Sequence, residues 1–161
     1  MKKIAIIAIV LALLSACGNG VVYTEFYSMP MDGWHQDSTL TFTTEVADST
    51  ACYDIQLVVR HTTQYPYQNL WLFVDEYAGN MLILQDTVEA MLADDYGRWL
   101  GTGIHRYELP LLYDEQHRFA QSGEHTFAIR QGMRTEWLKG ITEVGLVVKV
   151  TRLKVKGMDI K

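Results

Sequence analysis

The sequence is poor in cysteine and in positive charge. Its 161 residues include two cysteines, Cys17 and Cys52, and 14 lysines and arginines against 19 aspartates and glutamates, which gives a net charge of −5. Without Lys2 and Lys3 at the N-terminus the charge is −7. Nucleic-acid binding requires a basic surface. We therefore expect no nucleic-acid partner.

The sequence also lacks the usual motifs of catalytic and metal sites. It has no Gly-x-Ser-x-Gly elbow, no phosphate-binding glycine loop and no His-Glu-x-x-His pattern. Asp94 and Asp95 are adjacent, so a strand would direct them to opposite faces, which makes them poor partners for glycoside hydrolysis. None of the five histidines occurs at the close spacing of a local zinc site; they are His35, His61, His105, His117 and His125. We predict no enzymatic activity, no cofactor and no metal, with a hydrolase built from distant His and Asp residues as a third hypothesis.

One long apolar run is present, from Ile4 to Leu14. Eleven helical residues cover roughly 16 Å, about half of a ~30 Å hydrocarbon core. With Lys2 and Lys3 before it, the run predicts a secretory signal peptide rather than a membrane span. The following Leu14-Ser15-Ala16-Cys17 resembles the lipobox of bacterial lipoproteins, which implies that Cys17 begins the mature chain and carries the lipid. An ordinary signal peptide that ends in Ala-Cys is the alternative.

This interpretation divides the chain into three parts. We predict a lipoprotein signal peptide at residues 1–16, a lipidated tether at 17–22 and a single domain at 23–161. Acyl chains on Cys17 would hold the domain on a membrane, because two or more chains anchor stably. Cys52 then has no disulfide partner. A buried, unreactive thiol is the expectation for it, because residues 53–59 have a strand pattern.

Alternation of apolar and polar residues predicts a chain made of strands. The pattern covers residues 40–46, 53–59, 70–74, 81–84, 107–112, 125–130 and 144–150, with a hairpin turn at Gly79-Asn80. Helical signals are weak: residues 87–95 have apolar residues at helical spacing, and residues 134–139 are long enough for one turn. Seven or eight short strands predict an all-β fold, an antiparallel β-sandwich of jelly-roll or immunoglobulin-like type with little helix.

Aromatic residues gather in the segment 65–73, where Tyr65, Tyr67, Trp71 and Phe73 surround Pro66. Alternation directs Trp71 and Phe73 to one face of a strand and two leucines to the other. Both faces are apolar, which predicts a central strand or one covered on both sides. Core packing and an exposed patch that binds a partner are the two interpretations.

A glycine-rich loop follows at residues 97–103, with three glycines in seven positions. Glycines at this density indicate unusual backbone angles or a close approach of another segment. The loop would display Arg98 and Trp99. A tight turn between strands is the plainer interpretation, and a partner-binding loop is the alternative.

The order of these motifs resembles a known family. The motifs are Asp32 to Trp34, Arg60, Tyr65 to Phe73, Asp86-Thr87, Leu92 to Asp94, Gly97 to Gly103, Gln131 to Arg134, Leu138 to Ile141 and Val144 to Leu146. Together they resemble the GldH family of gliding-motility lipoproteins from Bacteroidota. The resemblance implies a non-enzymatic, membrane-anchored accessory protein, and it brings no catalytic residues or cofactors.

These observations lead to one main functional hypothesis and one alternative. The main hypothesis is a lipid-anchored interaction component of the gliding-motility machinery or of an associated envelope secretion machinery. Its candidate partner-binding residues are Tyr65, Tyr67, Trp71, Arg98, Trp99 and Arg134. The alternative is a β-sandwich that binds carbohydrate or peptidoglycan by stacking sugar rings on Trp34, Trp71, Trp99 or Trp137. The resemblance also implies an orientation, because surface-exported lipoproteins of that phylum tend to carry acidic residues just after the cysteine. Residues 18–21 include none, so we expect a domain that faces the periplasm.

Overall fold

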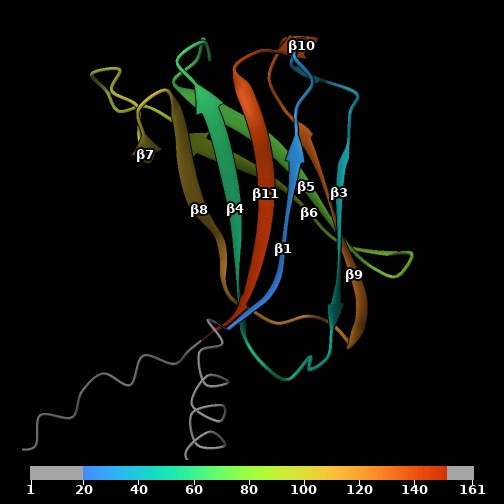
Figure 1. Cartoon of the computed structure of the whole chain (residues 1–161). Helices are drawn as coiled ribbons and strands as arrows, with labels where there is room; N and C mark the ends of the chain where they lie inside the picture. Colours follow the sequence, from blue (N-terminus) through green and yellow to red (C-terminus); the bar gives the residue numbers. More distant parts are fainter. Residues whose placement is uncertain (1–19, 152–161) are drawn as a thin grey trace, which may run out of the picture.

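The computed structural model describes residues 20–151. There the chain forms two packed antiparallel sheets, which confirms the predicted all-β sandwich (Figure 1). The first sheet contains, in spatial order, β1 (Val21–Ser28), β11 (Ile141–Val150), β4 (Tyr53–Thr62), β8 (Arg106–His117) and β7 (Thr102–Gly103). The second contains β3 (Leu40–Val46), β9 (Gly123–Gln131), β5 (Asn69–Ala78) and β6 (Met81–Met91). A small third sheet pairs β2 (Trp34–His35) with β10 (Trp137–Leu138).

The hydrophobic core lies between the two large sheets. Phe42 on β3 pairs with Phe127 on β9, and both side chains are fully buried. Leu72 on β5 and Leu57 on β4 enter the same cluster from opposite sheets. Burial of each such side chain contributes about 1.5–3 kcal/mol. The period of two seen in the sequence therefore sets the inner face of strands such as β3 and β9.

The two segments with weak helical signals form no helix. Residues 87–91 belong to β6, where Val88 pairs with Leu72 and Ala90 with Leu70. Packing against a central strand outweighs a weak helical pattern, because strand preference depends on such neighbours. Residues 134–139 form a loop and β10 instead of a helical turn. Within residues 20–151, the structure has no helix of the length and apolarity needed to cross a bilayer.

The N-terminal strand was not predicted. β1 begins at Val21, so residues 21 and 22 of the predicted tether belong to the sheet, where β1 pairs with β11. Cys17 and the predicted signal peptide lie outside the described residues. Cys52, just before β4, is partly rather than fully buried.

The two lateral sides of the sandwich differ. On one side β1 and β3 lie together, because Tyr27 donates from its hydroxyl to the carbonyl oxygen of Thr41 at 2.8 Å and packs edge-on against Phe42. On the other side, β6 is the last strand of its sheet, and no strand within residues 20–151 pairs with its outer edge. The facing edge strand of the first sheet is the two-residue β7.

Candidate functional site

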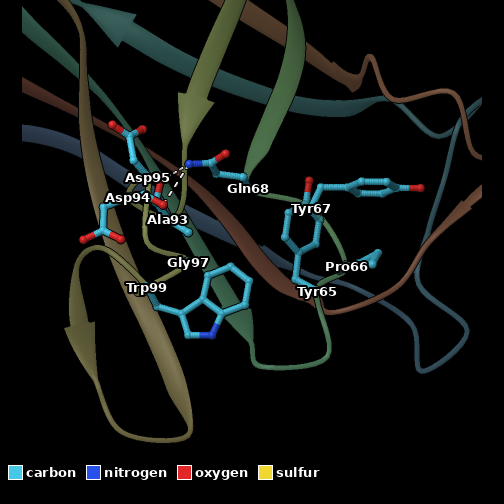
Figure 2. A pocket seen from close by; sticks show the side chains of 9 residues that line it. All are labelled: Tyr65, Pro66, Tyr67, Gln68, Ala93, Asp94, Asp95, Gly97 and Trp99. Atoms are coloured by element: carbon cyan, nitrogen blue, oxygen red, sulfur yellow. Dashed lines mark hydrogen bonds between the residues drawn. The ribbon is translucent and has the colours of Figure 1, made fainter.

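The aromatic segment and the glycine-rich loop meet at one open pocket. The pocket has a volume of about 390 Å³ and lies where the chain enters β5, beside the loop that follows β6 (Figure 2). Its lining residues are Tyr65, Pro66, Tyr67, Gln68, Ala93, Asp94, Asp95, Gly97 and Trp99. We call this hollow the loop pocket. Two segments that the sequence singled out separately therefore form one surface.

Backbone hydrogen bonds fasten the two segments to each other. The carbonyl oxygen of Gln68 accepts from the N–H groups of Leu92 (2.8 Å) and Ala93 (3.0 Å). The side chain of Gln68 donates in return to the carbonyl oxygen of Asp94 at 2.8 Å, as Figure 2 shows. An isolated bridge between Ala93 and Trp99 closes the loop. The pocket wall is thus held by main-chain bonds rather than by side-chain packing alone.

Asp94 organises the loop that carries Arg98. Its carboxylate accepts from the N–H groups of Tyr96 and Arg98, both at 2.9 Å, and from Nε of Arg98 at 2.7 Å. These bonds, first among them the one from the Arg98 N–H, hold the pKa of Asp94 below its usual value. The carboxylate is therefore already occupied by its own loop, which leaves Asp95 as the other acidic group on the pocket wall.

The glycines of the loop allow close backbone contact. Gly101 has a φ of 83°, and a Cβ atom there would collide with the carbonyl oxygen of Glu108 on β8. Gly103 has a φ of 143° and meets the carbonyl oxygen of Arg106 in the same way. The sequence predicted close approach from glycine density, and these two positions confirm it.

Tyr65 and Trp99 form the inner part of the loop pocket. Tyr65 is only 2% exposed, and its hydroxyl donates to the carbonyl oxygen of Asn69 at 2.7 Å. Burial raises its pKa. Trp99 is partly buried and packs edge-on against His61, with ring centroids 4.7 Å apart. Tyr65 therefore belongs to the core and shapes the pocket, whereas the ring of Tyr67 points away from Trp99 (Figure 2).

A second hollow of about 340 Å³ continues from Tyr67 along the outer face of β5. It is lined by Tyr67, Asn69, Trp71, Gly132, Met133 and Arg134. A third, of about 230 Å³, follows next to it and shares Gly132 and Met133 while adding Phe73 and Arg130. We define the aromatic strip as Tyr67, Trp71, Phe73, Met133 and Arg134. The strip links the three hollows.

The strip occupies the outer face of a central strand. β5 lies between β9 and β6, as one of the two sequence interpretations required. Leu70 and Leu72 are fully buried, whereas Trp71 and Phe73 remain 37% and 39% exposed. Of the two alternatives, the central strand is therefore the one that holds: among the described residues no layer covers this outer face. Gly132, directly after β9, allows the backbone to pass close to this face, because a Cβ atom there would lie 3.2 Å from the side chains of both Trp71 and Phe73.

The six predicted partner-binding residues thus fall into three groups. Tyr67, Trp71 and Arg134 lie on the strip, while Tyr65 and Trp99 form the loop pocket. Arg98 lines neither hollow; its side chain is 76% exposed and pairs with Asp94, with the guanidinium 5.5 Å from the Tyr96 ring centre. Sequence reasoning missed Met133 and Gln68. The Gln-x-Met-Arg motif contained a signal for Met133, whose sulfur accepts from the N–H of Trp71 at 3.4 Å.

Two further sequence hypotheses concern histidine and tryptophan. Within the described part of the chain, no group of three or more His, Cys, Asp or Glu side chains is placed to hold a metal ion. Trp34 is 1% exposed, and its Nε1 donates to the carbonyl oxygen of Ser38 at 3.0 Å. Trp34 is therefore a core residue and is unavailable for stacking on a sugar, which corrects one of the four tryptophan candidates.

Comparison with solved structures gives only distant likenesses. The mitogen from Yersinia pseudotuberculosis is 9% identical with a TM-score of 0.34, over 84% of this chain and 90% of that one. Dimeric latent PorU from Porphyromonas gingivalis is 10% identical with a TM-score of 0.28, over 84% of this chain and 14% of that one. At TM-scores this low, neither likeness bears on function.

Comparison with protein sequences is more informative. A gliding motility lipoprotein GldH homolog from Christiangramia forsetii is 33% identical over 145 residues, covering 85% of this chain and 88% of the relative. The gliding motility lipoprotein GldH of Flavobacterium johnsoniae is 31% identical over 157 residues, covering 92% and 97%. The sequence profile of the GldH lipoprotein family matches residues 21–148, which is nearly the whole described domain. This chain belongs to the GldH lipoprotein family.

Proposed function

We propose that this chain is a lipid-anchored, non-enzymatic component of the cell envelope that serves gliding motility or an associated secretion machinery. Relatives that are named gliding motility lipoproteins align over most of the chain, which supports a role in gliding motility at the cell envelope. In this proposal Cys17 carries the acyl chains, residues 18–20 act as a short link, and the sandwich faces the periplasm. The domain then binds a protein partner through the aromatic strip.

The observation that carries the binding role is the exposure of the aromatic strip on a rigid support. Trp71 and Phe73 project from a central strand whose opposite face is fully buried. Aromatic residues, Met and Arg are enriched in the cores of protein interfaces. Contiguous exposed apolar side chains of this kind mark interaction sites more often than isolated ones do. The loop pocket at one end offers a recess for a projecting side chain of the partner.

The binding role is tested by capture from native membranes. Full-length, tagged protein with Trp71→Ala or Tyr67→Ala is compared with Tyr96→Ala, which replaces an 86% exposed tyrosine outside the strip. We expect the first two variants to lose an envelope protein that the wild type and Tyr96→Ala retain. Capture of the same proteins by all four forms would refute the proposed strip.

The anchoring role has a separate test. Cys17→Ala should accumulate as an uncleaved precursor or leave the membrane fraction, because the acyl chains supply the anchor. Metabolic labelling with a fatty-acid analogue reports the lipid directly. A variant that is processed and retained on the membrane as in the wild type would contradict it.

Carbohydrate binding is the second candidate, and the composition of the loop pocket favours it. The partly buried ring of Trp99 and the carboxylate of Asp95 both line this pocket. The test is quenching of tryptophan fluorescence by peptidoglycan fragments, with Trp99→Phe as the matched variant. A flat titration in the wild type removes this candidate and leaves protein binding.

A further inference from the structure

We infer that the outer edge of β6 receives the C-terminal segment of a second copy of this chain, residues 152–156, as an added antiparallel or parallel strand. This inference is independent of the aromatic strip, which lies on a sheet face rather than on an edge. It begins from an edge that the described domain leaves open and from a chain segment whose pattern fits that edge.

The outer edge of β6 lacks the usual protection against pairing. β6 is 11 residues long and is the last strand of the second sheet. Natural edge strands are blocked by lysine, proline, short length or bulges. β6 has no lysine, arginine or proline, and its register shift opposite Glu76 and Tyr77 is confined to one end. Its unpaired N–H and C=O groups can therefore accept another strand.

The side chains of β6 are suited to a strand that is apolar on one face. Met81, Leu82, Ile83 and Leu84 are consecutive exposed apolar residues. Across the open side of the sandwich, Leu109 and Leu111 on β8 are only partly buried although they pack against the core. An added strand with inward apolar side chains would cover the inward side chains of both β6 and β8. Covering apolar surface in this way favours association.

The charges of β6 identify the occupant as basic. The strand carries Asp86 and Glu89 and no positive charge. Asp75 on the neighbouring β5 already pairs with Arg130 at 3.0 Å. Glu89 pairs with the exposed Trp71 and therefore lies on the outer face. A second copy of β6 would add further acidic groups, whereas a strand that is basic on its outer face would neutralise Glu89. Opposite charges on adjacent strands stabilise pairing, and like charges destabilise it.

The C-terminal segment of this chain has the required pattern. Arg152, Lys154 and Lys156 alternate with Leu153 and Val155, so a strand formed by these residues is basic on one face and apolar on the other. The pattern begins directly after Thr151, whose N–H donates to the carbonyl oxygen of Cys52 at 2.8 Å. Thr151 is thus tied to the first sheet, with β4 and β8 between β11 and the edge that faces β6. A pairing that begins at residue 152 has no linker with which to reach β6 of the same chain. We therefore place the pairing between two copies.

The test is cysteine crosslinking between two differently tagged full-length copies in native membranes, with Cys52→Ser in both. One copy carries Thr87→Cys on β6. The other carries a cysteine at one position from 152 to 156. Thr87 pairs with the exposed Phe73 and so lies on the outer face of the sheet. After mild oxidation, we expect disulfide-linked dimers that contain both tags, strong for Arg152→Cys, Lys154→Cys and Lys156→Cys and weak for Leu153→Cys and Val155→Cys. Alternation is the signature of a paired strand.

Matched controls and contrary results are clear. Thr43→Cys on the β3 edge should give no dimer with the tail cysteines, and Leu84→Lys on β6 should reduce the Thr87→Cys dimer about tenfold, whereas Met31→Lys should not. Equal crosslinking at all five tail positions, crosslinking within a single chain, or dimers formed by Thr87→Cys copies without a tail cysteine would each overturn the inference. So would an absence of dimers.

Discussion

The carboxylate of Glu76 and the imidazole of His117 face each other between the two sheets, with Oε1 3.4 Å from Nε2. The same oxygen lies 3.4 Å from Nδ1 of His125, whose side chain is fully buried. Asp114 lies 2.8 Å from Nδ1 of His117 on its other side. Because Glu76 belongs to β5 and His117 ends β8, this cluster ties one sheet to the other.

The cluster makes stability depend on pH. Burial lowers the pKa of His117, but hydrogen bonds and attraction to Glu76 and Asp114 outweigh it and raise the pKa above the ordinary 6.5. A raised pKa in the folded state stabilises the protein fully below the unfolded-state value, and this contribution disappears as pH rises through the folded-state value. We expect the loss of unfolding free energy in His117→Gln to be largest below about pH 6 and to shrink in alkaline buffer. Urea unfolding over that range measures the difference.

The control for this experiment is His105→Gln, at an exposed histidine. Burial lowers the pKa of His61, so its contribution to the unfolding free energy changes with pH in the opposite direction. That contribution is the same in the wild type and in both variants. Tyr113 and Asp86 lie beside the cluster, and neither residue is substituted in this experiment. A His117→Gln deficit that does not vary with pH would contradict the proposed role of its charge.

Neighbouring residues on β5 should have opposite effects on stability and binding. Leu72 is fully buried, so Leu72→Ala should lower the unfolding free energy by about 2–5 kcal/mol. Trp71 lies one position earlier, on the outer face. Trp71→Ala should lower the unfolding free energy by less than about 1 kcal/mol but abolish partner binding. Chemical denaturation and membrane capture on the same preparations separate the two. A large stability loss for Trp71→Ala would place its ring in the core.

Substitution of Gly101 should disrupt the loop more than substitution of a comparable glycine. Gly101 and Gly123 both have positive φ, but a Cβ on Gly123 would meet open space. Gly123→Ala should therefore show only the backbone cost of about 1 kcal/mol. Gly101→Ala adds a collision with the backbone at Glu108 and should destabilise further and alter the near-ultraviolet signal of Trp99. Equal stability of the two variants would count against close packing of the loop on β8.

Asp94 and Asp95 are adjacent, but only one should matter for loop order. Asp94→Ala removes the acceptor of three hydrogen bonds. We expect amide exchange at Tyr96 and Arg98 to accelerate about tenfold or more, because those N–H groups lose their partner. Asp95→Ala should leave both rates unchanged. The same exchange rates in both variants would show that the loop holds its shape without the carboxylate.

Much of the fold follows from local pattern in the sequence. Residues 40–46 form β3 over the predicted range, because alternation there matches a half-buried strand. The Gly79-Asn80 turn joins β5 and β6 as predicted. β1 escaped prediction because most of its side chains are exposed on both faces, so its pairing with β11 rather than its own pattern defines it.

The candidate site was predictable in composition but not in arrangement. The sequence marked the aromatic segment and the glycine-rich loop, yet nothing local indicated that Gln68 joins them through Leu92 and Ala93. Tyr65 and Tyr67 are two residues apart, and an ideal strand would place both on one face. The bend around Pro66 instead buries Tyr65 and turns Tyr67 outward. Such separation depends on tertiary packing, which no local pattern encodes.

The most direct test of the account is photo-crosslinking from the aromatic strip in the native host. Benzoyl-phenylalanine replaces Trp71 in one full-length protein and Tyr96 in another, and membranes are irradiated before purification. We predict a discrete adduct with an envelope protein from position 71 and none from position 96. No adduct at position 71, or the same adduct from both positions, would contradict a partner-binding strip.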